Sequence, residues 1–197
     1  MGVNVAGEAA RIRIEALLAR WRVTAEWLTP TAAACGVVNH YEVPSQLGAD
    51  RWAALIAARK RAVAYELFPP PAVVVNAGTA VTVDALGADG VFRGGMILPG
   101  LRLMLRALAE NTAGLKVAPG LHREFPTNTA DALYSGAVDA VRGAIESMRA
   151  RLSSDAVKAK CYLAGGAAGE IAPHLTAPVE VVDNLVLEGV YALAEAG

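Results

Sequence analysis

Cysteine is scarce in this sequence of 197 residues: Cys35 and Cys161 are its two copies, and no metal-ligand spacing surrounds either one. This usage predicts reduced thiols in a cytoplasmic protein, with neither a disulfide framework nor a cysteine metal site. An excess of one charge sign is also lacking, because the net charge is −1. Since no basic patch stands out, nucleic acid is not an expected partner.

Long apolar runs are absent as well, although hydrophobic residues make up 54% of the chain. No run reaches the roughly 18 apolar residues that a membrane-spanning helix requires, so we expect no membrane association. Glu8, Arg11 and Arg13 lie where a signal peptide would need an apolar segment. The sequence therefore predicts no signal peptide.

The stretch from Ala72 to Gly100 is the most informative part of the chain. Three consecutive valines at 73–75 predict a buried strand, because β-branched residues favour strands. Further along we expect a polar turn at 76–79, strands at 81–86 and 91–98, a four-residue hairpin connection at 87–90, and a helix after Pro99 and Gly100. Two expected loops, 78–79 and 94–95, carry backbone with little side-chain bulk, which lets anionic oxygens approach N–H groups.

The remaining segments predict an α/β fold, since strands and helices alternate in the second half. Helices are expected near 14–21, from Asp50 to Val63, and at 129–151, 168–175 and 184–194. Strands are expected at 3–7, 23–28, 161–164 and 179–182. Consecutive prolines at 69–71 cannot continue a helix, and they mark a boundary between domains 1–70 and 71–197.

Taken alone, the polar residues of these segments have ordinary structural interpretations. Asp50 precedes a predicted helix and suits an N-cap, and Thr129 suits another. Arg51 suits a solvated first turn, Tyr41 a half-buried loop, and Thr79 a turn cap. The histidines at 40, 122 and 174 have no mutual spacing and are interpreted as surface or loop residues, and the basic residues at 59–61 as a solvated helix face.

Four segments, taken together and in this order, resemble the type III pantothenate kinases of the actin-like ATPase and sugar-kinase superfamily. They are residues 39–52 (NHYEVPSQLGADRW), 76–84 (NAGTAVTVD), 94–100 (GGMILPG) and 129–136 (TADALYSG). The resemblance implies ATP-dependent phosphorylation of pantothenate, the first step of coenzyme A biosynthesis. It also implies an α/β, duplicated ribonuclease H-like fold, with residues 1–70 and 71–197 as the two halves.

The resemblance further implies roles for single residues. Asp50 would take the proton from the pantothenate hydroxyl as the catalytic base. Pantothenate would be bound by Tyr41, Gly48, Ala49, Asp50, Arg51 and Thr129, the last reaching across a homodimer interface. ATP with Mg²⁺ would be bound by Gly78, Thr79, Gly94 and Gly95.

Two departures from the family pattern affect these expectations. The family's first phosphate loop, of Asp-x-Gly-Asn type, has no counterpart here, so we expect an incomplete first half and weak phosphate transfer by this chain alone. Asn76 stands where the family usually has Asp, a position associated with a monovalent cation. Asparagine keeps a carbonyl oxygen but loses the charge, which puts a K⁺ or NH₄⁺ site in doubt.

Two alternative functions remain open from the sequence. The first is a non-catalytic binding or regulatory relative that keeps the fold without the first phosphate loop. The second is a dinucleotide-binding oxidoreductase, because residues 164–169 (AGGAAG) nearly match the glycine fingerprint, departing at its first glycine. A P-loop NTPase is excluded, since the Gly-x4-Gly-Lys-Ser/Thr pattern does not occur.

Overall fold

The computed structural model describes residues 1–111 and 119–196. The chain forms two compact units. The first contains Met1–Pro69, Leu86–Gly94 and Asn184–Gly197, and the second contains Pro70–Ala85 and Gly95–Asp183. The chain therefore passes between units at the proline run, within the hairpin near residues 86 and 94, and again before the last helix.

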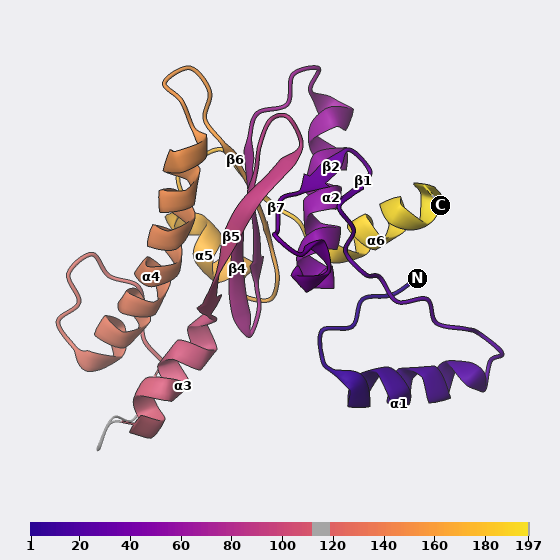
Figure 1. The fold of residues 1–197 in the computed structure, drawn as a ribbon. Helices are drawn as coiled ribbons and strands as arrows, with labels where there is room; N and C mark the ends of the chain where they lie inside the picture. Colours follow the sequence, from indigo (N-terminus) through magenta and orange to yellow (C-terminus); the bar gives the residue numbers. More distant parts are fainter. Residues whose placement is uncertain (112–118, 197) are drawn as a thin grey trace. The chain divides into compact units, whose positions relative to one another are not determined.

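The first unit contains two helices in direct contact, α2 (Ala49–Tyr65) and α6 (Leu185–Ala196), drawn in purple and yellow (Figure 1). A Cβ atom on Gly189 would collide with the backbone of Ala53, so glycine allows this close crossing. The unit's short strands are β1 (Ala33–Ala34) and β2 (Val37–Asn39), which pair antiparallel; β2 also pairs parallel with the start of β5 (Val91–Pro99). A single 3-10 turn, η1 (Pro44–Gln46), precedes α2.

The N-terminal segment contains the expected helix, α1 (Glu8–Ala19), but none of its side chains is buried. The strands predicted at 3–7 and 23–28 are wrong, because an isolated bridge between Gly2 and Trp27 is the β pairing found there within the described residues. A strand needs a partner strand to satisfy its backbone groups, and an apolar run alone does not supply one. The side chain of Trp27 instead donates to Glu15 of α1, at 2.7 Å.

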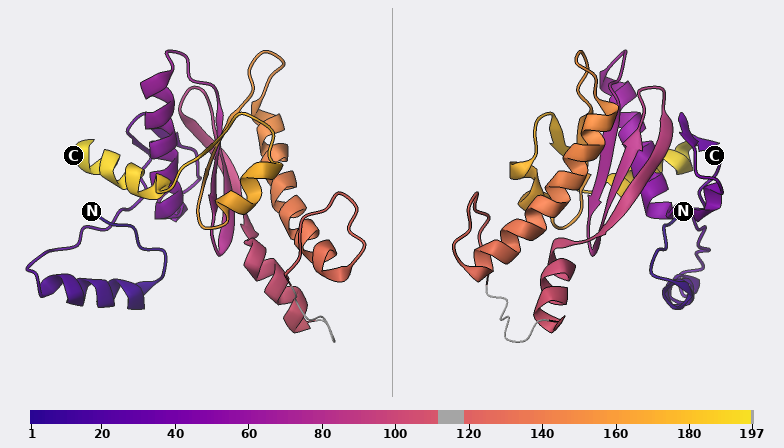
Figure 2. Two further views of the ribbon diagram at one scale, coloured as in Figure 1. Left: turned by 180° about the vertical axis from the view of Figure 1, so that it is seen from behind. Right: turned by 60° about the vertical axis from the view of Figure 1, so that its left-hand side comes forward.

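The second unit is a sheet with the strand order β5-β4-β3-β6-β7, in which β3, β6 and β7 run parallel. Its further strands are β3 (Ala72–Ala77), β4 (Ala80–Leu86), β6 (Lys160–Ala164) and β7 (Val179–Val181). Its helices are α3 (Leu101–Asn111), α4 (Thr129–Leu152) and α5 (Ala168–Ile171), the last continuing into the 3-10 turn η2 (Ala172–His174). In both views of Figure 2, α4 and α5 lie on the same side of these strands.

The core of the second unit lies between one sheet face and these helices. Alternate residues of each strand point to this face, because side chains alternate across a strand. The strands contribute Val73, Val75, Val81, Val83, Cys161 and Leu163, and the helices contribute Leu101, Val138, Val141, Ile145 and Ile171. Burial raises the pKa of the Cys161 thiol to about 12, so this cysteine is a core residue with little thiolate character.

The structure confirms the α/β class and most of the expected elements. The helix expected from Asp50 begins one residue earlier, and the helices expected after residues 100, 129, 168 and 184 are all present. The strands β1 and β2 were not expected, since they are short and lie in a segment without alternation. Among the described residues, none of the helices is long and apolar enough to span a membrane.

Candidate functional site

In the first unit, the segment that resembles a pantothenate motif surrounds a buried arginine. Arg51, in the first turn of α2, is only 5% exposed. Its Nη1 donates to the hydroxyl of Tyr41 at 2.8 Å. Its guanidinium carbon lies 5.5 Å from the ring centroid of Tyr41 and 5.8 Å from that of Phe92. Two aromatic faces and a hydroxyl therefore hold this cation in place.

Asn39 fixes the loop that carries Tyr41. Its side-chain amide is buried and donates to the carbonyl oxygens of Thr31 and Pro44, at 3.3 and 3.2 Å. Its Oδ1 accepts from the backbone N–H of Tyr41 at 3.1 Å. All hydrogen-bonding groups of the amide are thus engaged in shaping the loop, which sets the position of the tyrosine ring.

Asp50 lies in the first turn of α2, beside Arg51. The N-cap is Gly48, so the sequence-based assignment of Asp50 as N-cap is wrong by two positions. Oδ1 of Asp50 accepts from the backbone N–H of Arg51 at 2.8 Å. A Cβ on Gly48 would lie 2.7 Å from this oxygen, so the glycine leaves room for the carboxylate. Ala49 between them is buried.

In the second unit, the turn between β3 and β4 consists of exposed Gly78 and Thr79. Gly100 brings another backbone segment against this turn, and Gly165 brings one against the adjacent end of β3. A Cβ on Gly100 would collide with the carbonyl of Gly78, and a Cβ on Gly165, whose φ is +100°, would lie 2.6 Å from the carbonyl oxygen of Ala77. The backbone N–H of Gly100 donates to Thr79 at 2.8 Å.

The turn borders a cavity of about 280 Å³. The cavity is lined by two segments outside α3 and by residues of α3, namely Ala77, Gly78, Thr79, Gly166 and Ala167, and Leu101, Arg102, Leu103 and Arg106. Small residues predominate where the chain segments meet, so backbone groups are accessible from the cavity. Such surfaces suit anionic oxygens, which accept hydrogen bonds from backbone N–H groups.

The structure corrects the expected loop at Gly94 and Gly95. Both residues lie inside β5, with Gly94 at φ +117° and open space where its Cβ would be. Neither is among the residues that line the cavity beside Gly78 and Thr79. Their assignment to ATP stays a prediction, as does that of Asn76, which lies in β3 opposite Ala164 of β6.

Thr129 begins α4 and lines a different cavity. The side chain that caps this helix is that of Asn128, which accepts from Asp131, and not that of Thr129. The cavity lies between α3 and α4, measures about 670 Å³ and is almost entirely apolar. Its lining includes Leu103, Met104, Leu108, Ala132, Leu133 and Gly136.

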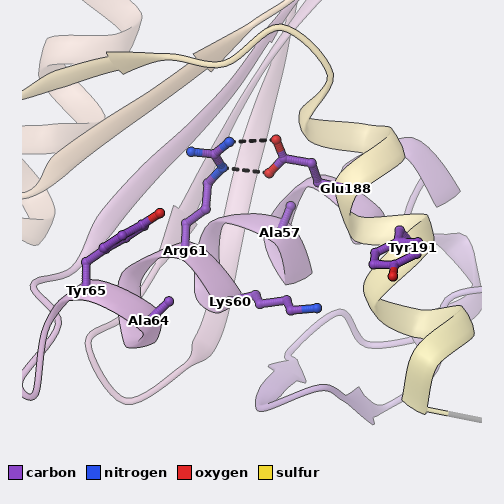
Figure 3. Close-up of a pocket in the computed structure, with 7 residues that line it drawn as sticks. All are labelled: Ala57, Lys60, Arg61, Ala64, Tyr65, Glu188 and Tyr191. Atoms are coloured by element: carbon purple, nitrogen blue, oxygen red, sulfur yellow. Dashed lines mark hydrogen bonds and ion pairs between the residues drawn. The ribbon is translucent and has the colours of Figure 1, made fainter.

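The basic residues 59–61 are not merely a solvated face of α2. Arg61 binds both carboxylate oxygens of Glu188 in α6 at 2.6 Å, in a cavity of about 260 Å³ (Figure 3). This guanidinium holds the pKa of Glu188 below its ordinary value. Lys60 pairs with Glu195 at 2.7 Å, and Arg59 donates to the carbonyl of Ala88. These contacts join α2 to α6 and to the β4–β5 hairpin.

Two histidines without any relation in the sequence meet in the second unit. The rings of His122 and His174 lie 4.1 Å apart between centroids, and His122 Nε2 lies 3.2 Å from Asp139 Oδ1. Sequence spacing carries no signal for this pair, because the two segments come together only through the packing against α4. Nothing in the sequence indicated that Phe92 belongs to the site. Phe92 lies in β5, and it comes close to the loop of Tyr41 only because β2 pairs with β5.

Comparison with known proteins agrees with the four motifs. The family model for type III pantothenate kinase matches residues 1–151. The type III pantothenate kinase of Methylibium petroleiphilum is 49% identical over 195 residues, which cover 98% of this chain and 76% of that protein. That of Albidiferax ferrireducens is 47% identical over 196 residues, with coverage of 98% and 76%.

A solved structure from Campylobacter jejuni, assigned to the Baf family of transcriptional activators, has a similar fold. It is 23% identical, with a TM-score of 0.60, and the match covers 85% of this chain and 68% of that one. This comparison concerns the fold alone, and the family assignment rests on the sequence matches. The chain thus belongs to the type III pantothenate kinase family, whose members phosphorylate pantothenate with ATP in coenzyme A biosynthesis.

Proposed function

We propose that Asp50, Arg51 and Tyr41 form the pantothenate-binding and catalytic part of this kinase. The observation that carries the proposal is the buried Arg51, whose guanidinium is fixed by Tyr41 and Phe92 and whose backbone N–H donates to the carboxylate of Asp50. A buried charge is costly unless its partners hold it in place. A fixed cation of this kind suits the carboxylate of pantothenate. Gly48 and Ala49 contribute the small backbone surface next to it.

Asp50 is proposed as the base that orients and deprotonates the attacking hydroxyl of pantothenate. One carboxylate oxygen is engaged by the N–H of Arg51, which sets the orientation of the group. Phosphoryl transfer depends on positioning and on neutralising charge more than on covalent chemistry. A correctly oriented carboxylate near the hydroxyl is therefore sufficient for the role.

We further propose that ATP phosphates bind at the Gly78–Thr79 turn, with Gly94 and Gly95 also contributing to the ATP site. Mg²⁺ would accompany the phosphates, because magnesium usually keeps several waters and binds through phosphates and few carboxylates. At position 76 the asparagine offers an amide oxygen without charge, so a K⁺ or NH₄⁺ ion is expected to contribute little.

The second unit is proposed to be one ribonuclease H-like half of the fold. Its first three strands follow one another as β3, β4 and β5 across the sheet, and β6 and β7 are added in parallel on the other side of β3. We also propose a homodimer in which Thr129 reaches the pantothenate of the partner. The apolar cavity between α3 and α4 that Thr129 lines supports an interface at this place.

The test of the catalytic proposal is Asp50→Asn. We expect kcat to fall by roughly 10²–10⁴, with little change in the affinity for ATP, because a base acts only on the pantothenate hydroxyl. Asp155→Asn is the matched control, since this exposed carboxylate lies in a loop of the second unit. Near-normal turnover of Asp50→Asn would contradict the assignment and leave Asp50 with a structural role.

A further inference from the structure

The cavity beside the Gly78–Thr79 turn has one wall that neither the sequence motifs nor the proposed ATP contacts explain. This wall is the first turns of α3, where Arg102 and Arg106 line the cavity together with Leu101 and Leu103. Residues four positions apart lie on the same helix face. Both guanidinium groups therefore belong to the side of α3 that borders the cavity.

The charged side chains that line this cavity are of one sign. Among residues 1–111 and 119–196, its lining contains two arginines and no Asp or Glu. Within the described residues neither Arg102 nor Arg106 makes an ion pair. Other arginines do: Arg61 pairs with Glu188, Arg93 with Asp89 and Arg142 with Asp139. Arg102 and Arg106 are thus exposed, have no acidic partner among the described residues, and line a cavity.

The rest of the lining consists of small residues at 77–79 and 166–167. A Cβ on Gly100 would collide with the Gly78–Thr79 turn, a Cβ on Gly165 would collide with the backbone of Ala77, and Ala167 donates its N–H to Ala77 at 3.0 Å. These close contacts fix the backbone, whereas the two arginine side chains are long and adjustable. A ligand that enters the cavity therefore meets fixed backbone groups and two guanidinium groups.

We propose that Arg102 and Arg106 bind phosphate oxygens of the nucleotide, in the cavity that they share with the Gly78–Thr79 turn. The proposal rests on the assignment of ATP to this cavity. Guanidinium groups match phosphate geometry because they donate paired, charge-assisted hydrogen bonds. Two of them on one helix face would neutralise part of the charge of a polyphosphate. They are phosphate-binding residues, distinct from the pantothenate-binding Arg51.

The experiment is calorimetric titration of the purified chain with ATP, ADP and adenosine in the presence of Mg²⁺. Arg102→Gln and Arg106→Gln are each expected to raise the Kd for ATP by about tenfold, in line with loss of one charge-assisted hydrogen bond. The Kd for adenosine should stay within about twofold, since adenosine has no phosphate. Arg102→Lys keeps the charge without the fork and should recover part of the loss.

Two controls separate this proposal from the assignment of ATP to the cavity. Arg151→Gln removes an exposed arginine from α4, outside the cavity, and should leave all three affinities unchanged. Thr79→Val tests the turn itself. Weaker ATP binding by Thr79→Val with unchanged binding by both α3 variants would overturn the role of the arginines and keep the site. An equal loss of affinity for ATP and for adenosine in the α3 variants would also overturn the role of the arginines, because it would indicate altered packing. A chain that binds no ATP at all would overturn both.

Discussion

At the scale of single residues, Arg51 is the clearest case of a buried charge held by its neighbours. A charged group that is only 5% exposed needs partners to offset its lost hydration. Tyr41 supplies both a hydroxyl and an aromatic face, and Phe92 supplies a second face. The two rings themselves lie 5.5 Å apart, so the three side chains form one packed group.

Tyr41→Phe should raise the KM for pantothenate by roughly 5- to 50-fold, because it removes a hydrogen bond to a charged group and keeps the ring. The kcat at saturating pantothenate should change much less, since Asp50 is untouched. Steady-state kinetics with pantothenate varied at fixed ATP measures this split. Tyr65→Phe, at an exposed tyrosine near the end of α2, is the control. A loss of kcat with unchanged KM would show that Tyr41 acts in another way.

At the scale of elements, the crossing of α2 and α6 depends on a missing side chain. Gly189 faces the backbone of Ala53 with no room for a Cβ. Ion pairs of Arg61 with Glu188 and Lys60 with Glu195 flank the crossing, and all four side chains are partly exposed. Exposed pairs contribute little to stability, so the close packing of the helices is the larger effect.

Gly189→Ala should lower the free energy of unfolding by about 1–3 kcal/mol, because the helices must move apart to admit the methyl group. Gly143→Ala in α4 is the matched control, since nothing lies within 4 Å of its would-be Cβ. That change should stabilise the protein by about 0.5–1 kcal/mol, as expected for alanine in a helix. Denaturant unfolding measures the free energy of unfolding of both variants. Equal effects of the two substitutions would contradict the close crossing of α2 and α6.

The segment before α4 is held on that helix by a ladder of side chains one turn apart. Asp131 accepts from the N–H of Leu121, and Ser135 from that of Arg123, at 2.8 and 2.9 Å. Asp139 contacts His122, whose ring packs on His174. Burial, with the adjacent His122 and Arg142, holds the pKa of His174 below its usual 6.5, and Asp139 opposes this shift.

His174 therefore makes stability depend on pH near neutrality. Its folded-state pKa is depressed, so below pH 6.5 the unfolded chain binds more protons than the folded chain does. The contribution is present above pH 6.5 and is lost as the pH falls toward the folded-state pKa. We expect Tm to decrease as the pH falls below 6.5, and His174→Gln to reduce this dependence on pH. His40→Gln, at an exposed loop histidine, should not change it; an unchanged slope in His174→Gln would refute the assignment.

At the scale of the whole molecule, the apolar cavity between α3 and α4 bears on assembly. Exposed apolar surface often marks an interaction site, and Thr129 lies on the border of this cavity. Sedimentation at micromolar concentration should give a dimer. Leu133→Lys, which places a charge in the cavity, should shift the protein toward the monomer and raise the KM for pantothenate. A monomeric wild-type chain would count against Thr129 as a contact in trans.

The sequence by itself determined the local elements and the identity of the motifs. The valines at 73–75, the hairpin at 87–90 and the prolines at 69–71 act through short-range preferences, so the predicted strands, turn and helix end are present in the structure. The segments at 39–52, 76–84, 94–100 and 129–136 identified the family, because their residue types and order are specific. For a kinase site, this is enough to nominate Asp50, Arg51 and Thr79.

Only the tertiary structure decided which side chains meet. The aromatic contacts of Arg51 need Phe92 from β5, and the pair of His122 with His174 forms beside Asp139 of α4. The cavity of Arg102 forms where Gly100 packs on the turn and Gly165 packs on the end of β3. Apolar runs at 3–7 and 23–28 failed to become strands for the same reason, since backbone pairing depends on a partner elsewhere in the chain. Contacts between segments distant in sequence are set by packing, which local patterns do not encode.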